Sequence, residues 1–185
     1  DYPNGLLVEE FINGKEVTVP ILSGVELDPI EVKIDSKVFQ KKKYNIYDYE
    51  IKHYLDKDCV IGSIAKFPKK VLNTIKSQAL LAAKAMHCVD FGRVDFRVNS
   101  KGEPYFLEIN CLPAIGPDEF IFFAAAQIGM SVENVLEKIL DNAIERFPQL
   151  KDIKNNKVKN KKLVTQKNIL IFPEKKSAYS GSLLI

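Results

Sequence analysis

Apolar and polar residues alternate in two neighbouring segments near the start of the chain. In residues 16–22 (EVTVPIL) the alternation has a period of two, which predicts a β-strand with Pro20 at an edge or a bulge. Residues 26–34 (ELDPIEVKI) predict its partner strand. The polar, tyrosine-rich residues 35–58 that follow are typical of a long loop lying over another part of the molecule. We therefore expect a strand pair and a loop before the first helix.

The rest of the chain changes between helical and strand periodicity. Apolar residues recur at helical spacing over residues 69–88, and again after Ser131, a good N-cap residue, as far as Phe147. Between these helices, residues 93–98 (RVDFRV) and 105–109 (YFLEI) alternate strictly around a glycine-containing turn, which predicts a β-hairpin. This order of elements predicts an α+β fold with an antiparallel sheet and flanking helices.

Composition agrees with a folded domain and excludes a membrane span. The chain has 185 residues, of which 46% are hydrophobic and 10% aromatic, enough to build a core. Its most apolar run, residues 120–126 (FIFFAAA), is far shorter than the ~20 residues that a spanning helix requires. We expect no membrane partner. Because the chain starts with Asp1 and not with Met, we also expect it to begin inside a larger protein.

Positive charge is concentrated in one short tract. Residues 1–150 contain 18 Lys and Arg against 22 Asp and Glu, whereas residues 151–167 contain seven lysines and one aspartate. No arginine or aromatic residue is interleaved with these lysines, so the tract is predicted to be a Lys/Asn-rich linker and not a nucleic-acid site. Residues 168–185 are expected either to begin a further, truncated segment or to return as a C-terminal strand.

Cysteine and histidine are sparse. Cys59, Cys88 and Cys111 are odd in number and widely spaced, which fits neither a disulfide framework nor a CxxC metal pair and suits a reducing compartment. Two histidines are too few for a histidine-rich metal site.

The hairpin carries the strongest chemical signal. If Val98 pairs with Tyr105, one face of the hairpin brings together two carboxylates, one amide and one guanidinium. These residues are Arg93, Asp95, Glu108 and Asn110, and the opposite face of the second strand holds Tyr105, Leu107 and Ile109. Oxygen donors of this kind suit Mg²⁺, which binds one or two carboxylates and completes its shell with water and phosphate. Ordinary cross-strand ion pairs on a solvated face are the alternative, and the hairpin alone does not distinguish the two.

Four segments resemble the ATP-grasp domain of D-alanine–D-alanine ligases and occur in the order found in that family. They are residues 8–19 (VEEFINGKEVTV), 47–55 (YDYEIKHYL), 92–98 (GRVDFRV) and 104–117 (PYFLEINCLPAIGP). The resemblance covers residues 5 to about 147. It implies that residues 1–150 are the C-terminal part of an ATP-grasp domain, without the N-terminal domain and without the half of the module that carries the first phosphate-binding lysines.

The resemblance implies an enzyme, an ATP-dependent ligase that forms C–N bonds. Such a ligase phosphorylates the carboxylate of one amino acid with ATP, and the amine of a second then attacks the acyl phosphate. Two Mg²⁺ ions, with Mn²⁺ as an alternative, small amino-acid-like substrates, cytoplasmic peptidoglycan biosynthesis and a homodimer of the full-length protein are implied as well. The fragment itself is expected to be inactive, because half of the nucleotide cleft is missing.

Residue roles follow by matching the family's motifs. The resemblance assigns Asp95, Glu108 and Asn110 as Mg²⁺ ligands, with Glu108 bridging two ions. Arg93 would steady the transferring phosphoryl group, and Lys52 would lie in the mobile loop that closes over the γ-phosphate. The nucleotide itself would contact Glu9, Phe11, Ile12, Glu16 and Leu107.

Departures from the family concern the second substrate. After the ligating asparagine the family usually reads Thr-x-Pro-Gly, whereas this chain reads Cys-Leu-Pro-Ala, ending at Ala114. The family's serine for the substrate carboxylate is replaced by Glu119, and the position after Lys52, commonly tyrosine, is His53. A carboxylate at this position would repel a substrate carboxylate. We therefore expect an amine acceptor that lacks this carboxylate, or one that carries a cationic group near Glu119.

Two alternatives remain beside the first interpretation. One is an ATP-grasp ligase with a different amine acceptor, which the changes at Ala114 and Glu119 favour. The other is a non-catalytic module that only binds nucleotide. The joint presence of the three metal-ligand candidates with Arg93 and Lys52 argues against that module, which would have no need of all five.

Overall fold

An antiparallel sheet forms the centre of the molecule in a computed structural model, which describes residues 5–34, 60–116 and 118–147. The strands follow the spatial order β4-β3-β1-β5-β6, and the short β2 pairs with β1. Their bounds are β1 (Gly14–Leu22), β2 (Val25–Glu26), β3 (Ile30–Ile34), β4 (Val60–Ile64), β5 (Phe91–Asn99) and β6 (Pro104–Asn110). The helices are α3 (Lys69–Ala85), α4 (Phe120–Gln127) and α5 (Val132–Arg146). The predicted α+β class is confirmed.

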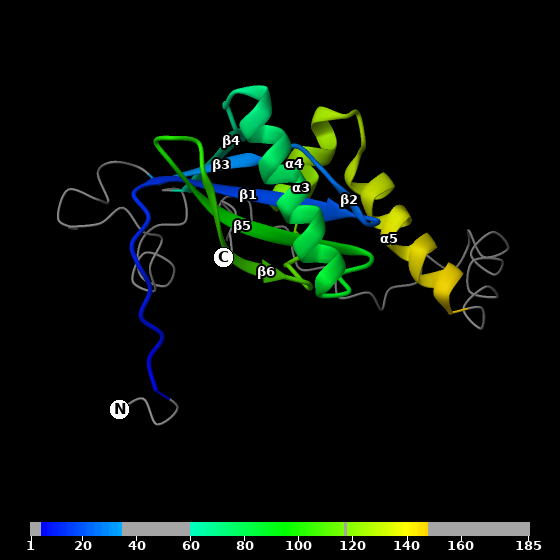
Figure 1. Ribbon diagram of the computed structural model, residues 1–185. Coiled ribbons are helices and arrows are strands. Elements are labelled where there is room, and N and C mark those ends of the chain that lie inside the picture. The colour runs from blue at the N-terminus through cyan, green and yellow to red at the C-terminus, as the bar shows by residue number, and fades with distance from the viewer. Residues whose placement is uncertain (1–4, 35–59, 117, 148–185) are drawn as a thin grey trace, which may run out of the picture.

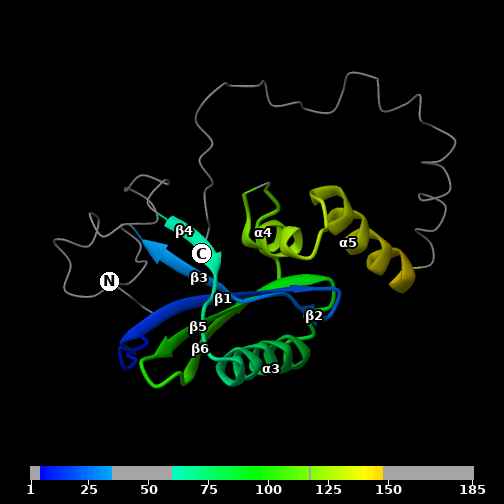
Figure 2. The same ribbon diagram turned by 90° about the horizontal axis from the view of Figure 1, so that it is seen from above.

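Helices cover both faces of the sheet (Figure 1). Figure 2 shows α3 on one side and α4 with α5 on the other. On the α3 side, alternate residues of β1 and β5 pack against Ile75, Ala79 and Ala83 of the helix. On the opposite side, α4 packs on Ile30 and Phe91 at one end of the sheet. Much of that second face therefore remains available to polar side chains.

A Schellman motif ends α3 and directs the chain into the core. The N–H of Cys88 donates to the Ala83 carbonyl (2.9 Å), and the N–H of His87 donates to the Lys84 carbonyl (3.2 Å). His87 is left-handed, with φ at 51°, where glycine is more usual. The turn buries the Cys88 side chain directly before β5 begins.

A capping box starts α5 and confirms Ser131 as its N-cap. The Ser131 hydroxyl accepts from the Asn134 N–H (3.2 Å), and the Asn134 side chain accepts from the Ser131 N–H (3.1 Å). The predicted apolar stripe is only partly buried: Val135 and Ile144 are enclosed. Ile139 and Ala143 are half-buried, and Val132, Leu136, Leu140 and Phe147 are exposed.

The hairpin has the predicted site register together with one irregularity. Asp95 lies opposite Glu108 and Arg93 opposite Asn110, as expected. A shift between Asp95 and Phe96 then leaves Leu107 without a partner, so that Val98 pairs with Pro104. The expected pairing of Val98 with Tyr105 is therefore wrong by one residue. The placement of Tyr105 on the opposite face is wrong for the same reason, because it pairs with Arg97 and shares its face.

Two elements were not predicted. The strand β4 contains Gly62, where a Cβ would lie 2.5 Å from the Phe120 ring, so the α4 side chain packs directly on the backbone. The helix α4 is apolar nearly all round and gives no helical alternation. The expected loop at 35–58 and the segments after residue 150 lie outside the described residues. Within the described ranges no single helix could cross a membrane, although α4 and α5, bent by 105° at their junction, would pass as a pair on length and composition alone.

Candidate active site

Three charged residues of β5 lie on the sheet face that α4 only partly covers. Val94, Phe96 and Val98 point into the α3 core, so the intervening residues point the other way. These are Arg93, Asp95 and Arg97, and all three are buried. Charges buried at this depth need partners, because desolvation otherwise disfavours the folded state.

Asp95 is held by two donors. The Thr18 hydroxyl of β1 donates to Asp95 Oδ1 at 2.6 Å. Arg93 Nε donates to Oδ1 and Oδ2 at 3.1 and 3.2 Å. The β1–β5 register explains the first contact, since Thr18 lies directly opposite Asp95. No role was predicted for Thr18, although the alternation of residues 16–22 already places it on the same face as Glu16.

Glu108 and Asn110 complete the oxygen donors on this face. Glu108 is exposed beside the buried Asp95, and the Asn110 Oδ1 accepts from the Leu112 N–H at 3.0 Å, which fixes the amide orientation. The described residues contain no group of three or more His, Cys, Asp or Glu able to hold a metal, and the predicted set contains only two carboxylates. Two carboxylates and an amide oxygen on one face fit Mg²⁺, which takes its remaining ligands from water and phosphate.

Arg97 organises the edge of the site next to the segment that enters β1. Its Nε donates to the Ile12 carbonyl (2.7 Å), its Nη2 donates to the Gly14 carbonyl (2.9 Å), and its guanidinium lies 5.0 Å from the centre of the Phe11 ring. Arg97 Nη1 also contacts Glu16 Oε2 at 3.3 Å. Phe11, Ile12 and Glu16, expected from the sequence as nucleotide contacts, are therefore brought together by a residue whose role the sequence did not reveal.

Glu16 is a largely buried acid on this face. Burial raises the pKa of Glu16 to about 7, against the opposing attraction of Arg97, and the nearby Asp95 raises it further. The desolvation effect is larger than the attraction of Arg97 even though that contact is within ion-pair distance. Glu16 can therefore change its charge near neutral pH.

The two expected substrate residues meet Arg93 in a small hollow. Arg93, Ala114 and Glu119 line it together with Pro20 of β1 and the start of α4. Glu119 is buried at the N-cap of α4, and burial raises its pKa while Arg93 opposes that shift. Ala114 and Glu119, expected to face the substrate, therefore lie beside Arg93, the predicted phosphoryl-stabilising residue.

Of the other predicted residues, the structure describes two, and it does not bring them into this cluster. Lys52 lies outside the described residues, as does His53. Glu9 is exposed in the extended segment before β1, and Leu107 is the bulged residue of β6, 44% exposed. Their assigned contacts with nucleotide stay predictions.

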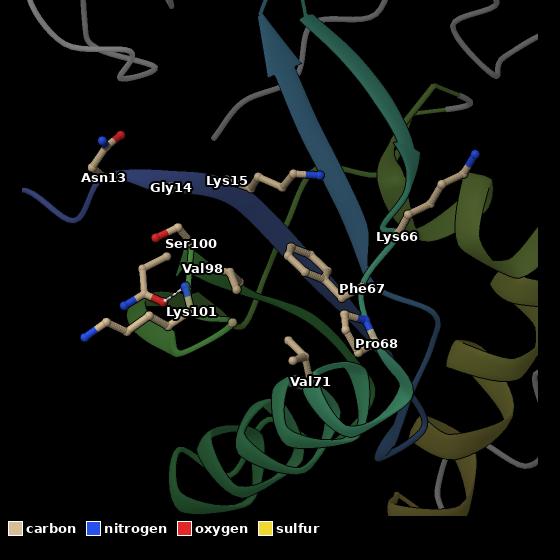
Figure 3. A pocket seen from close by; sticks show the side chains of 12 residues that line it. Asn13, Gly14, Lys15, Lys66, Phe67, Pro68, Val71, Val98, Ser100 and Lys101 are labelled. Atoms are coloured by element: carbon tan, nitrogen blue, oxygen red, sulfur yellow. Dashed lines mark hydrogen bonds between the residues drawn. The ribbon is translucent and has the colours of Figure 1, made fainter.

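A larger hollow lies on the α3 side of the sheet, opposite to the face that carries Arg93 and Asp95. It has a volume of about 540 Å³ and lies between the hairpin turn and the start of α3 (Figure 3). Lys15, Lys66, Lys101 and Phe67 line it, and none of the predicted site residues that the structure describes does. Its size does not make it the candidate site, because Arg93, Asp95 and the opposing Glu108 and Asn110 are on the other face.

Comparisons with known proteins identify the family of the chain. The family model described as D-ala D-ala ligase C-terminus matches residues 1–141. A D-alanine–D-alanine ligase of Pelotomaculum thermopropionicum is 33% identical over 146 residues, which cover 78% of this chain and 44% of that protein. One of Nitrosospira multiformis is 33% identical over 138 residues, covering 73% and 41%.

A solved structure has a similar fold. The D-alanine–D-alanine ligase of Bacillus anthracis superposes with a TM-score of 0.59 at 25% identity, covering 74% of this chain and 41% of that chain. The chain spans about two fifths of the length of the curated relatives it matches.

Proposed function

Because the chain belongs to the D-alanine–D-alanine ligase family, whose C-terminal model it matches over residues 1–141, we propose that it supplies the metal-binding half of an ATP-dependent ligase. That ligase joins a carboxylate to an amine through an acyl phosphate. The activity is proposed for the intact gene product, since the chain spans about two fifths of its relatives. The cytoplasmic location, the homodimer and the role in peptidoglycan synthesis stay predictions.

The observation that carries the proposal is the register of the hairpin. Asp95 opposite Glu108 and Arg93 opposite Asn110 give one face both the oxygen donors and the cation that phosphoryl transfer requires. Asp95, Glu108 and Asn110 would hold Mg²⁺, which when bound neutralises negative charge on the phosphates. The Thr18 hydroxyl and Arg93 fix the Asp95 carboxylate before any ligand arrives.

Other residues of this face would position the nucleotide. The Arg97 contacts hold the Phe11 ring and the Ile12 backbone beside the charged face, where they can border an adenine. Glu16, held nearby through the same guanidinium, would accept hydrogen bonds from ribose hydroxyls. Arg93 would stabilise the charge that develops on the transferring phosphoryl group.

The acceptor is proposed to differ from the usual one. Glu119 lies beside Arg93 in a hollow that Ala114 also lines, where the family offers a serine and a glycine. A carboxylate-bearing acceptor would meet the Glu119 side chain in place of a neutral hydroxyl. An amine without that carboxylate, or one with a nearby cationic group, fits these residues better.

Ligase chemistry is tested by replacing Glu108 in the intact gene product. We expect Glu108→Gln to lower the rate of Mg²⁺-dependent ADP release by about a hundredfold or more. Loss of a residue that only supports a metal ligand typically costs about ten- to a hundredfold in affinity or activity, and Glu108 is itself a proposed ligand. ATP affinity should change far less. The matched control is Glu103→Gln, which alters a glutamate on the same hairpin that instead contacts Asn99. Equal loss in both variants, or none in either, would contradict the proposed metal site.

The acceptor is tested separately by measuring ADP release with a panel of amines at a fixed carboxylate donor. We expect amines without a carboxylate, or with an added cationic group, to support turnover better than D-alanine. Strict dependence on D-alanine would refute the acceptor proposal and leave the ligase assignment intact.

A further inference from the structure

Two cysteines lie together next to the candidate metal site. Cys88 is buried in the core between α3 and the sheet. Cys111 is exposed and follows Asn110 directly in the chain. Both thiols are free. They are 23 positions apart in the sequence and come from different elements, so their proximity arises only from the fold.

Gly92 makes this proximity possible. Gly92 directly precedes Arg93, which pairs with Asn110, and it therefore lies beside Cys111, the residue after Asn110. A Cβ on Gly92 would lie 2.3 Å from the Cys88 sulfur and 3.8 Å from the Cys111 Cα. The space that a side chain would occupy is therefore filled by the Cys88 thiol, which reaches across the glycine toward the other strand.

The two thiols are close enough to affect each other. Burial, and after it the neighbouring Cys111, raise the pKa of Cys88 to about 12. The Cys88 thiol also donates to the Phe91 carbonyl at 3.3 Å. The buried thiol thus lies next to an exposed one, and this proximity is what an intramolecular disulfide requires. Because the raised pKa keeps Cys88 in its thiol form, the exposed Cys111 is the residue that would react first.

We propose that Cys88 and Cys111 form a reversible disulfide when the protein meets a small-molecule disulfide such as oxidised glutathione. The exposed Cys111 sulfur attacks one sulfur of the oxidant, which breaks the S–S bond and releases one glutathione thiol. The Cys88 sulfur then attacks Cys111 and releases the second. The protein loses two electrons and two protons, and the oxidant is reduced to two thiols.

The bond would act on the neighbouring ligand. Asn110 is the last residue of β6 and directly precedes Cys111, and its Oδ1 already accepts from the Leu112 N–H on the far side of Cys111. Drawing Cys111 toward the core would move this amide away from Asp95 and Glu108. This regulatory consequence, unlike the disulfide itself, rests on the proposed metal site.

The disulfide is tested on the chain in glutathione redox buffers, with acid quenching, alkylation of free thiols and peptide mass mapping. We expect oxidation to protect Cys88 and Cys111 from alkylation, with a loss of two hydrogens from the linked peptides. Cys59→Ser should behave like the parent, whereas Cys88→Ser should leave Cys111 as a mixed disulfide with glutathione. Alkylation of all three cysteines under oxidising conditions, or a bond to Cys59, would overturn the proposal.

The consequence is tested by measuring Mn²⁺ affinity of the oxidised and reduced forms by electron paramagnetic resonance. We expect oxidation to weaken Mn²⁺ binding about tenfold. This is the lower end of the loss of metal affinity that follows when the residues supporting a metal ligand are changed. In the Cys88→Ser and Cys111→Ser variants, treatment with oxidised glutathione should change the Mn²⁺ affinity no more than a mixed disulfide does. Unchanged affinity in a protein with the mapped bond would refute the regulatory role. Absence of Mn²⁺ binding in both forms would count against the metal site and not against the disulfide.

Discussion

Replacing Glu16 by glutamine should change how stability depends on pH. Glu16 lies on the charged face of the sheet, and its side chain is only 16% exposed. Burial raises the pKa of Glu16 from 4.5 to about 7. Between these values the folded protein holds a proton that the unfolded chain releases. The free energy of unfolding therefore falls as pH rises through this window.

The size of the effect follows from the shift. One pKa unit corresponds to about 1.4 kcal/mol, so this shift costs the folded state at most roughly 3 kcal/mol once pH exceeds about 7. Glu16→Gln removes the titrating group and keeps the shape of the side chain. Relative to the parent, the variant should gain up to roughly 3 kcal/mol of stability between pH 4.5 and pH 7.5.

Urea unfolding followed by circular dichroism at several pH values between 4.5 and 7.5 measures this difference. Glu137→Gln, on the exposed surface of α5, is the matched control, and its difference from the parent should stay within about 0.5 kcal/mol. A Glu16→Gln difference that stays flat or falls with pH would refute the reasoning. It would mean that attraction to Arg97 outweighs the cost of burial.

Three other substitutions, each measured by urea unfolding, test a hydrogen bond, a close packing contact and a helix cap. Thr18→Val should cost about 1–3 kcal/mol because the buried Asp95 loses a 2.6 Å hydrogen bond, while Thr18→Ser should retain most of the stability. Gly92→Ala should cost about 1–3 kcal/mol through overpacking against Cys88, and a second change, Cys88→Ala, should recover part of the loss; no recovery would contradict the contact. Ser131→Ala should cost about 1 kcal/mol through loss of the α5 cap, and an unchanged midpoint would mean that the capping box contributes nothing.

Alternation in the sequence was enough to find the hairpin and its charged face. The pairings of Asp95 with Glu108 and of Arg93 with Asn110 were predicted correctly, since residues two apart on a strand share a face. The bulge at Leu107 was not predicted, because one extra residue leaves the local pattern unchanged. Relative to Glu108 and Asn110, it moves the residues before Leu107 to the other face. Tyr105 was misplaced for that reason alone.

The helix α4 and the buried contacts of Thr18 and Arg97 could not be predicted, for a different reason. The helix α4 is apolar on all sides, so it lacks the period that identified α3 and α5. The roles of Thr18 and Arg97 depend on neighbours about 80 residues away in the chain, which no local pattern contains. The proximity of Cys88 to Cys111 depends likewise on a glycine in a third segment.

By itself, the sequence determined the fold class, the family and the set of oxygen donors, because periodicity and motif order are properties of neighbouring residues. The tertiary structure decided which of those groups are buried and what they touch. Burial raises the pKa of Glu16, and the register of β1 with β5 brings Thr18 to Asp95. Both effects depend on segments distant in the chain, and they exist only once the strands have paired.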